Sequence, residues 1–113
     1  MKIALLNTTI CTGGAGTYRL DSIDLAGVIN CIGEALQYAD PITSFIGHES
    51  TAQVLSTLLE IPVAMSRAQF KHDAETSAIC FKLNGRPEEG KILTALEIEE
   101  IGYEFFLMTF EPE

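Results

Sequence analysis

His48 lies in the segment F-I-G-H-E-S-T (residues 45–51), where a short apolar stretch runs into an amphipathic one. Glu49, Ser50 and Thr51 are residue types favoured in a first helical turn. A helix N-terminus presents unpaired N–H groups and the positive end of a dipole, and can therefore hold a phosphate. An imidazole there can give or take a proton near neutral pH. This position favours proton transfer beside a bound phosphate, although most histidines at helix starts serve only as hydrogen-bonding residues.

Further candidate phosphate contacts occur before His48 and in a polar loop. Gly47 permits a close backbone approach beside the histidine. The loop N-G-R-P-E-E-G-K (84–91) supplies Arg86, Glu89 and Lys91. The planar guanidinium of Arg86 can neutralise a phosphate while Glu89 orients a hydroxyl or the base. The alternative is an ordinary solvated turn.

Two other segments contain polar residues that are open to either interpretation. Arg67, in a segment with little other charge, either pairs with an acid or is a second anion anchor. Asn7, Thr8 and Thr9 follow the first predicted strand, and strand ends often contact ligands in open α/β sheets. The same residue types also make ordinary turns. His72, in an acidic stretch, is expected to lie in solvent.

The composition predicts one soluble, cytosolic domain over residues 1–113. Hydrophobic residues make up 47% of the chain, enough to bury a core, and the longest apolar run is too short to span a membrane. The net charge of −9 opposes binding of long nucleic acids but leaves room for a small anionic ligand. Three cysteines without a C-x-x-C pair are expected to be reduced thiols, and two histidines make a weak case for a metal.

The hydrophobic pattern predicts an α/β domain with a mixed sheet of about five strands and helices mainly on one face. Strands are expected at 2–6, 18–20 (a brief edge strand), 41–46, 67–71, 76–83 and 103–110. Helices are expected after a cap at Asp21 or Ser22, from His48 to Ile61-Pro62, and from a cap at Thr94 to near Gly102. The glycine-rich stretch 12–17 is predicted to be a loop, since it lacks the G-K-[ST] ending of a phosphate-binding loop.

Three ordered motifs resemble those of the viral ring nucleases, anti-CRISPR proteins that act against type III systems. They are I-G-H-E-S-T (46–51), Arg67 within S-R-A-Q-F-K, and R-P-E-E-G-K-I-L (86–93). The resemblance covers roughly residues 44–101 well and the first strand more loosely. The loop N-T-T-I-C-T-G-G after that strand differs from the viral pattern.

The resemblance implies a homodimeric enzyme, independent of metals and cofactors, that cleaves cyclic tetra-adenylate to linear di-adenylate. His48 would be the general acid, Arg86 would hold the scissile phosphate, and Glu89 would help position the reacting groups. Arg67 and Lys91 would meet other phosphates of the ring. The remaining expected substrate contacts are Asn7, Thr8, Thr9, Gly47 and Ser50. The enzyme would work in the cytoplasm, that of the host cell if a phage encodes it. Two alternatives are a non-catalytic sponge or sensor of the same messenger and an interaction protein from a mobile element.

Overall fold

The computed structural model describes residues 1–85 and 92–113. The elements in chain order are β1 (Lys2–Leu6), β2 (Gly16–Ile23), α1 (Leu25–Gln37), β3 (Ile42–Ser44), α2 (Glu49–Leu59), β4 (Thr76–Leu83), α3 (Ala95–Ile101) and β5 (Tyr103–Pro112). Arg86, Glu89 and Lys91 lie outside the described residues.

The strands form one five-stranded sheet in the order β2-β5-β4-β1-β3. β1 pairs in parallel with both β3 and β4, whereas β5 runs antiparallel to β4 and to β2. This confirms the predicted mixed sheet, with β2 at one edge. β2 is longer than the brief strand expected, since it pairs with β5 from Gly16 to Ile23.

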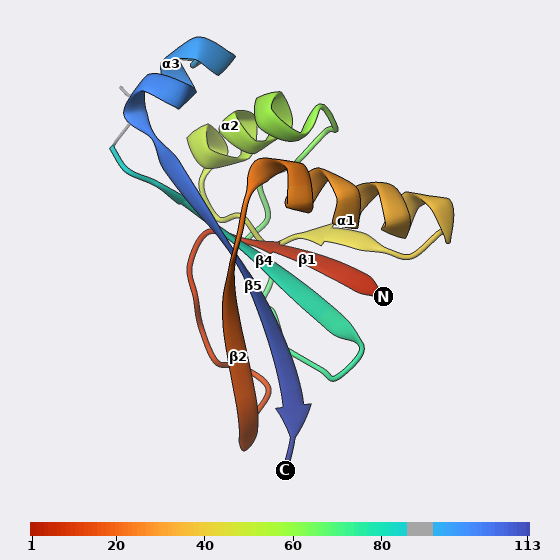
Figure 1. Ribbon diagram of the computed structural model, residues 1–113. Coiled ribbons are helices and arrows are strands. Elements are labelled where there is room, and N and C mark those ends of the chain that lie inside the picture. Colours follow the sequence, from red (N-terminus) through yellow and green to blue (C-terminus); the bar gives the residue numbers. More distant parts are fainter. Residues whose placement is uncertain (86–91) are drawn as a thin grey trace.

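The helices gather on one face of the sheet (Figure 1). Alternate residues of the inner strands, such as Leu5, Ile79 and Phe105, are buried against apolar residues of all three helices. Alternation places one residue in two on each face of a strand, and the apolar stripes of the helices cover one of these faces. The predicted placement of the helices is confirmed.

The start of α1 corrects the sequence-based cap assignment. Asp21 and Ser22 pair with β5 as part of β2, which ends at Ile23. The cap is Asp24, whose side-chain oxygen accepts a hydrogen bond from the Gly27 N–H at 2.8 Å. Asp and Ser both suit a helix cap, so residue type alone does not choose between Asp21, Ser22 and Asp24. The cap falls at Asp24 because β2 continues through the two earlier residues.

The predicted cap of the short helix α3 is confirmed. The Thr94 hydroxyl accepts from the Glu97 N–H at 3.2 Å, and the Glu97 carboxylate accepts from the Thr94 N–H at 3.2 Å. This reciprocal pair is a capping box, which satisfies two N–H groups at the helix start. The helix ends at Ile101, and the residue that caps it is Gly102, whose φ of 85° suits glycine.

The strand predicted at 67–71 is absent, and this segment is irregular. β4 already has β5 and β1 as neighbours, so no position beside it is open to a further strand. The segment instead brings Phe70 against a second apolar cluster on the sheet face opposite the helices, where Leu6, Cys80 and Met108 are buried. We call this the second face of the sheet.

His72 is buried, which contradicts the expectation that it lies in solvent. Its side chain is 2% exposed and surrounded by the rings of Tyr18, Phe70 and Phe110, with centroids 6.1, 5.1 and 5.6 Å away. Nε2 donates to the Thr76 carbonyl oxygen at 2.8 Å, and Nδ1 has no partner among residues 1–85 and 92–113. Tyr18 and Phe110 are distant in the sequence, so the local acidic pattern gave no sign of this environment.

Replacing His72 by alanine is expected to lower the free energy of unfolding by about 2–4 kcal/mol, measured by urea denaturation. The substitution leaves a cavity among aromatic rings and removes the donor to a buried carbonyl. His48→Ala, at an exposed histidine without a capping hydrogen bond, is the matched control and should change stability by less than about 0.5 kcal/mol. Equal effects of the two variants would contradict the structural role of His72.

Cys80 is expected to be almost unreactive in the folded protein. Burial raises the pKa of its thiol from 9.0 to about 11. At neutral or mildly alkaline pH, the fraction of Cys80 present as thiolate is therefore roughly 100-fold lower than for an exposed cysteine. Alkylation by iodoacetamide at pH 8, followed by mass spectrometry, should be about 100-fold slower or more at Cys80 in the folded protein than in urea. Exposed Cys11 provides the internal control, with rates that differ only several-fold between the two conditions.

Candidate active-site cleft

The parallel pairing of β1 with β3 and β4 brings three chain segments to one edge of the sheet. Asn7 follows the end of β1, and His48 follows β3 after a short turn. Lys82 lies near the end of β4. Ligands commonly bind outside the carboxyl ends of strands in open α/β sheets.

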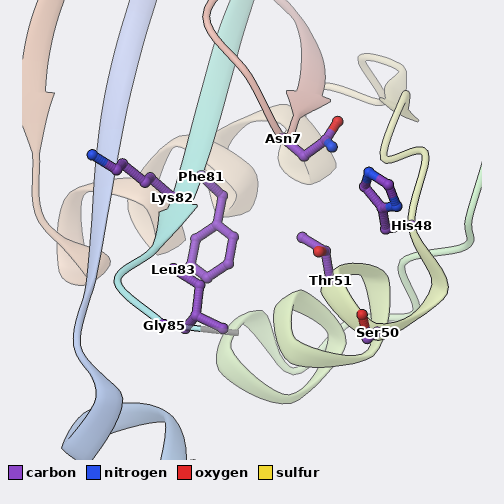
Figure 2. A pocket seen from close by; sticks show the side chains of 8 residues that line it. All are labelled: Asn7, His48, Ser50, Thr51, Phe81, Lys82, Leu83 and Gly85. Carbon is purple, nitrogen blue, oxygen red and sulfur yellow. The ribbon is translucent and has the colours of Figure 1, made fainter. Parts of the chain in front are cut away.

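A cleft of about 500 Å³ lies at this edge (Figure 2). Its lining residues are Asn7, His48, Ser50, Thr51, Phe81, Lys82, Leu83 and Gly85. The side chains of Asn7 and His48 face each other across the opening, and Ser50 and Thr51 lie in the first turn of α2 below the histidine (Figure 2). The cleft thus combines an imidazole, an amide and two hydroxyl groups.

The turn that carries His48 is hydrogen-bonded to the segment that follows α2. The Ser44 hydroxyl donates to the Ala64 carbonyl at 2.6 Å and accepts from the Ile46 N–H at 3.2 Å. The Ile46 carbonyl in turn accepts from the Ser66 N–H at 2.8 Å. These bonds fix the backbone immediately before His48, so the cleft holds the histidine on an anchored turn.

His48 is the residue that precedes the first turn of α2 and has extended backbone angles, with φ −127° and ψ 129°. Its carbonyl oxygen accepts from the Ala52 N–H at 3.0 Å, but its side chain makes no capping hydrogen bond. The ring is exposed and available to a ligand. The helix start also leaves first-turn N–H groups without a side-chain cap from this residue, as an anion site requires.

The structure brings together three of the predicted site residues: His48, Ser50 and Asn7 all line the cleft. Thr8 and Thr9 do not reach it. They line a smaller adjoining hollow of about 280 Å³, which Asn7 also borders.

Arg67 is exposed and does not line the cleft. Within residues 1–85 and 92–113 it makes no ion pair, so the pairing with an acid that the sequence left open is not observed there. It follows Ser66, whose N–H is bonded to the Ile46 carbonyl beside the His48 turn. Gly85, which lines the cleft, is the last described residue before Arg86.

Lys82 and Thr51 line the cleft without having been proposed as contacts from the sequence. The residue type of Thr51 predicts only that it lies in a first helical turn. Lys82 is the single charge in the otherwise uncharged strand β4, a signal that would have identified it. Its side chain points away from His48 (Figure 2) and borders the smaller hollow that contains Thr8 and Thr9.

Residues 3–105 match the family described as STIV B116-like. The chain belongs to this family. It is 38% identical over 109 residues to the Bacillus subtilis (strain 168) protein YddF, covering 96% of this chain and 97% of that protein. It is also 37% identical over 65 residues to protein 26 of Sulfolobus islandicus filamentous virus, covering 57% of this chain and 55% of the viral protein.

The fold of the STIV B116-like chain is that of a solved viral protein. B116 of Sulfolobus turreted icosahedral virus superposes with a TM-score of 0.83, covering 96% of this chain and 99% of B116, at 22% identity. The structural likeness supports the α/β fold predicted from the sequence. Among the described residues, no helix is both long and apolar enough to cross a membrane.

Gly47 differs from expectation, because a Cβ added there would meet no atom within 4 Å. Its φ also lies outside the left-handed region, so no close approach within the protein requires glycine. We expect Gly47→Ala to leave the free energy of unfolding unchanged or to raise it by about 0.4–1 kcal/mol in urea denaturation.

The control for this substitution is Gly102→Ala. Gly102 has φ 85°, and an added Cβ would lie 3.0 Å from the Asn84 amide nitrogen. This variant should be destabilised by about 1 kcal/mol or more. A loss of stability at Gly47 as large as that at Gly102 would contradict the open space seen beside His48.

Proposed function

We propose that this protein is a ring nuclease that cleaves cyclic tetra-adenylate to linear di-adenylate and thereby switches off type III CRISPR signalling. The observation that carries the proposal is the exposed His48 ring, held at the start of α2 and facing Asn7 across the cleft. Family membership and the three ordered motifs support it. The motifs support the identity of the substrate, and the cleft supports the chemistry, because it holds a candidate proton donor beside a helix N-terminus.

In the proposed reaction the substrate's own 2′-hydroxyl attacks the adjacent phosphorus. The 2′-oxygen–phosphorus bond forms, the bond from phosphorus to the 5′-oxygen breaks, and a 2′,3′-cyclic phosphate results. His48 protonates the departing 5′-oxygen, and the hydroxyl proton leaves to solvent. In this proposal, first-turn N–H groups of α2 and the hydroxyl of Ser50, which lines the cleft, hold phosphate oxygens. Arg86 and Glu89 keep the roles that the motif resemblance implies.

A symmetric ring suits two copies of the chain related by a two-fold axis, each supplying one His48. In this proposal, Arg67 and Lys91 of both copies meet the phosphates that are not being cleaved. The net charge of −9 acts against long nucleic acids, which need many neutralised phosphates, and therefore favours a compact ligand bound by local groups.

The direct test is cleavage of labelled cyclic tetra-adenylate by the purified protein, with and without a chelator, followed by chromatography. We expect linear di-adenylate in both conditions. His48→Ala should lower the rate by a factor on the order of 10²–10⁴, because the leaving oxygen loses its proton donor. Binding of the ring by this variant should be retained.

Tyr38→Ala provides the matched control, since Tyr38 is 66% exposed at the end of α1, outside the cleft lining. Its rate should equal that of the unmodified protein. Tight binding without cleavage by the unmodified protein would contradict the enzyme and favour the sponge or sensor. Full activity in His48→Ala would contradict the assigned acid.

A further inference from the structure

We propose that a second hollow beside the cleft is an adenine-reading subsite, and that the side-chain amide of Gln69 discriminates the base. The hollow has a volume of about 530 Å³ and is lined by Phe45, Phe70, Asn7, Gln69 and Lys71, among others. We call it the aromatic groove. The inference rests on the proposed function, because the base belongs to the same ring whose phosphate lies at His48.

The aromatic groove and the cleft are neighbours with a shared wall. Asn7 lines both hollows. Phe45, in the groove, lies on the anchored turn that leads to His48 in the cleft. A nucleotide that places a phosphate in the cleft can therefore direct an adjoining base into the groove. Because the two hollows share a wall, we take the occupant of the groove to be a base of the ligand whose phosphate lies in the cleft.

The groove offers the base two aromatic rings. The centroids of Phe45 and Phe70 are 5.1 Å apart and their planes are tilted by 54°. Both side chains are half-buried, so each ring is supported by the protein and still partly open. Bases stack on such rings whatever their identity. Stacking therefore supplies affinity, and the choice of base must come from polar groups.

Gln69 is the polar group best placed to make this choice. Its side chain is exposed and has no hydrogen-bond partner within residues 1–85 and 92–113. One amide can donate to N7 of adenine and accept from its N6 amino group. Guanine and hypoxanthine present two acceptors on that edge, at N7 and O6, so the amide oxygen would face an acceptor. An amide in this position therefore favours adenine.

The backbone on both sides of Gln69 is anchored. The Ala68 N–H donates to the Ser66 hydroxyl at 3.3 Å. The His72 N–H donates to the Thr12 hydroxyl at 3.0 Å, and the buried His72 ring lies against Phe70. Hydrogen bonds thus hold the backbone before and after Gln69, and a residue that determines specificity needs such a fixed position.

The test compares binding of cyclic tetra-adenylate and of its analogue in which hypoxanthine replaces every adenine. Dissociation constants are measured by calorimetry in the His48→Ala background, which prevents turnover. Gln69→Leu should weaken binding of the adenine ring by about 10-fold or more and leave the hypoxanthine ring within about 2-fold. Gln69→Arg should reverse the preference, because guanidinium donors match N7 and O6. Gln37→Leu, on an exposed glutamine of α1, is the matched control and should change neither constant.

Equal weakening of both rings by Gln69→Leu, or no weakening of either, would overturn the inference. Failure of the proposed function gives a different result. If the unmodified protein binds the adenine ring without cleaving it, the nuclease proposal fails, while the Gln69 preference still identifies the base subsite. If the unmodified protein binds neither ring, both proposals fall.

Discussion

The parallel pairing of β1 with two neighbours, β3 and β4, is the constraint on which the candidate site depends. Each pair fixes both direction and register, so that Leu5 lies opposite Ser44 on one side and Ile79 on the other. Three strand ends therefore meet at one edge of the sheet. The amide of Asn7 and the imidazole of His48 come from segments about forty residues apart, and only this pairing makes them face each other across a cleft. A change of register would separate the two side chains.

The two faces of the sheet are covered by different elements, one bordering the cleft and the other the aromatic groove. On the helical face, α2 packs against the core through residues such as Leu55 and presents its N-terminus to the cleft. On the second face, an irregular segment takes the place of helices and is fixed by Phe70 and the buried His72. That segment also forms the wall of the aromatic groove. The cleft and the aromatic groove thus lie at the strand ends, between α2 on one face of the sheet and the irregular segment on the other.

Local patterns were sufficient where the decisive contacts lie close in sequence. The amphipathic pattern after His48 predicted α2, and Thr94 predicted the capped start of α3. They were insufficient where partners are distant. The segment at 67–71 has strand-like residue types, but the sheet has no place for it beside β4. Two of the rings around His72, those of Tyr18 and Phe110, come from β2 and β5, which the neighbouring acidic residues do not reveal. The sequence therefore indicated Asn7, His48 and Ser50 as candidate site residues, while the other walls of the cleft, such as Lys82, emerged only from the topology.

The acidic character of the chain limits how it can bind the proposed anionic ligand. With nine more acidic than basic charges at neutral pH, the overall field repels an anionic ligand. For the proposed anionic ligand, attraction must then come from groups within a few ångströms, where screening by salt is weakest. The N-terminus of α2 is such a group, since its dipole is equivalent to about half a positive charge and His48 places no side-chain cap over it. Such a site binds best a ligand that brings each phosphate against a helix end and each base against an aromatic surface. A polyanion that depends on a broad basic surface would bind weakly. The distribution of charge that opposes long RNA is therefore compatible with a small cyclic nucleotide.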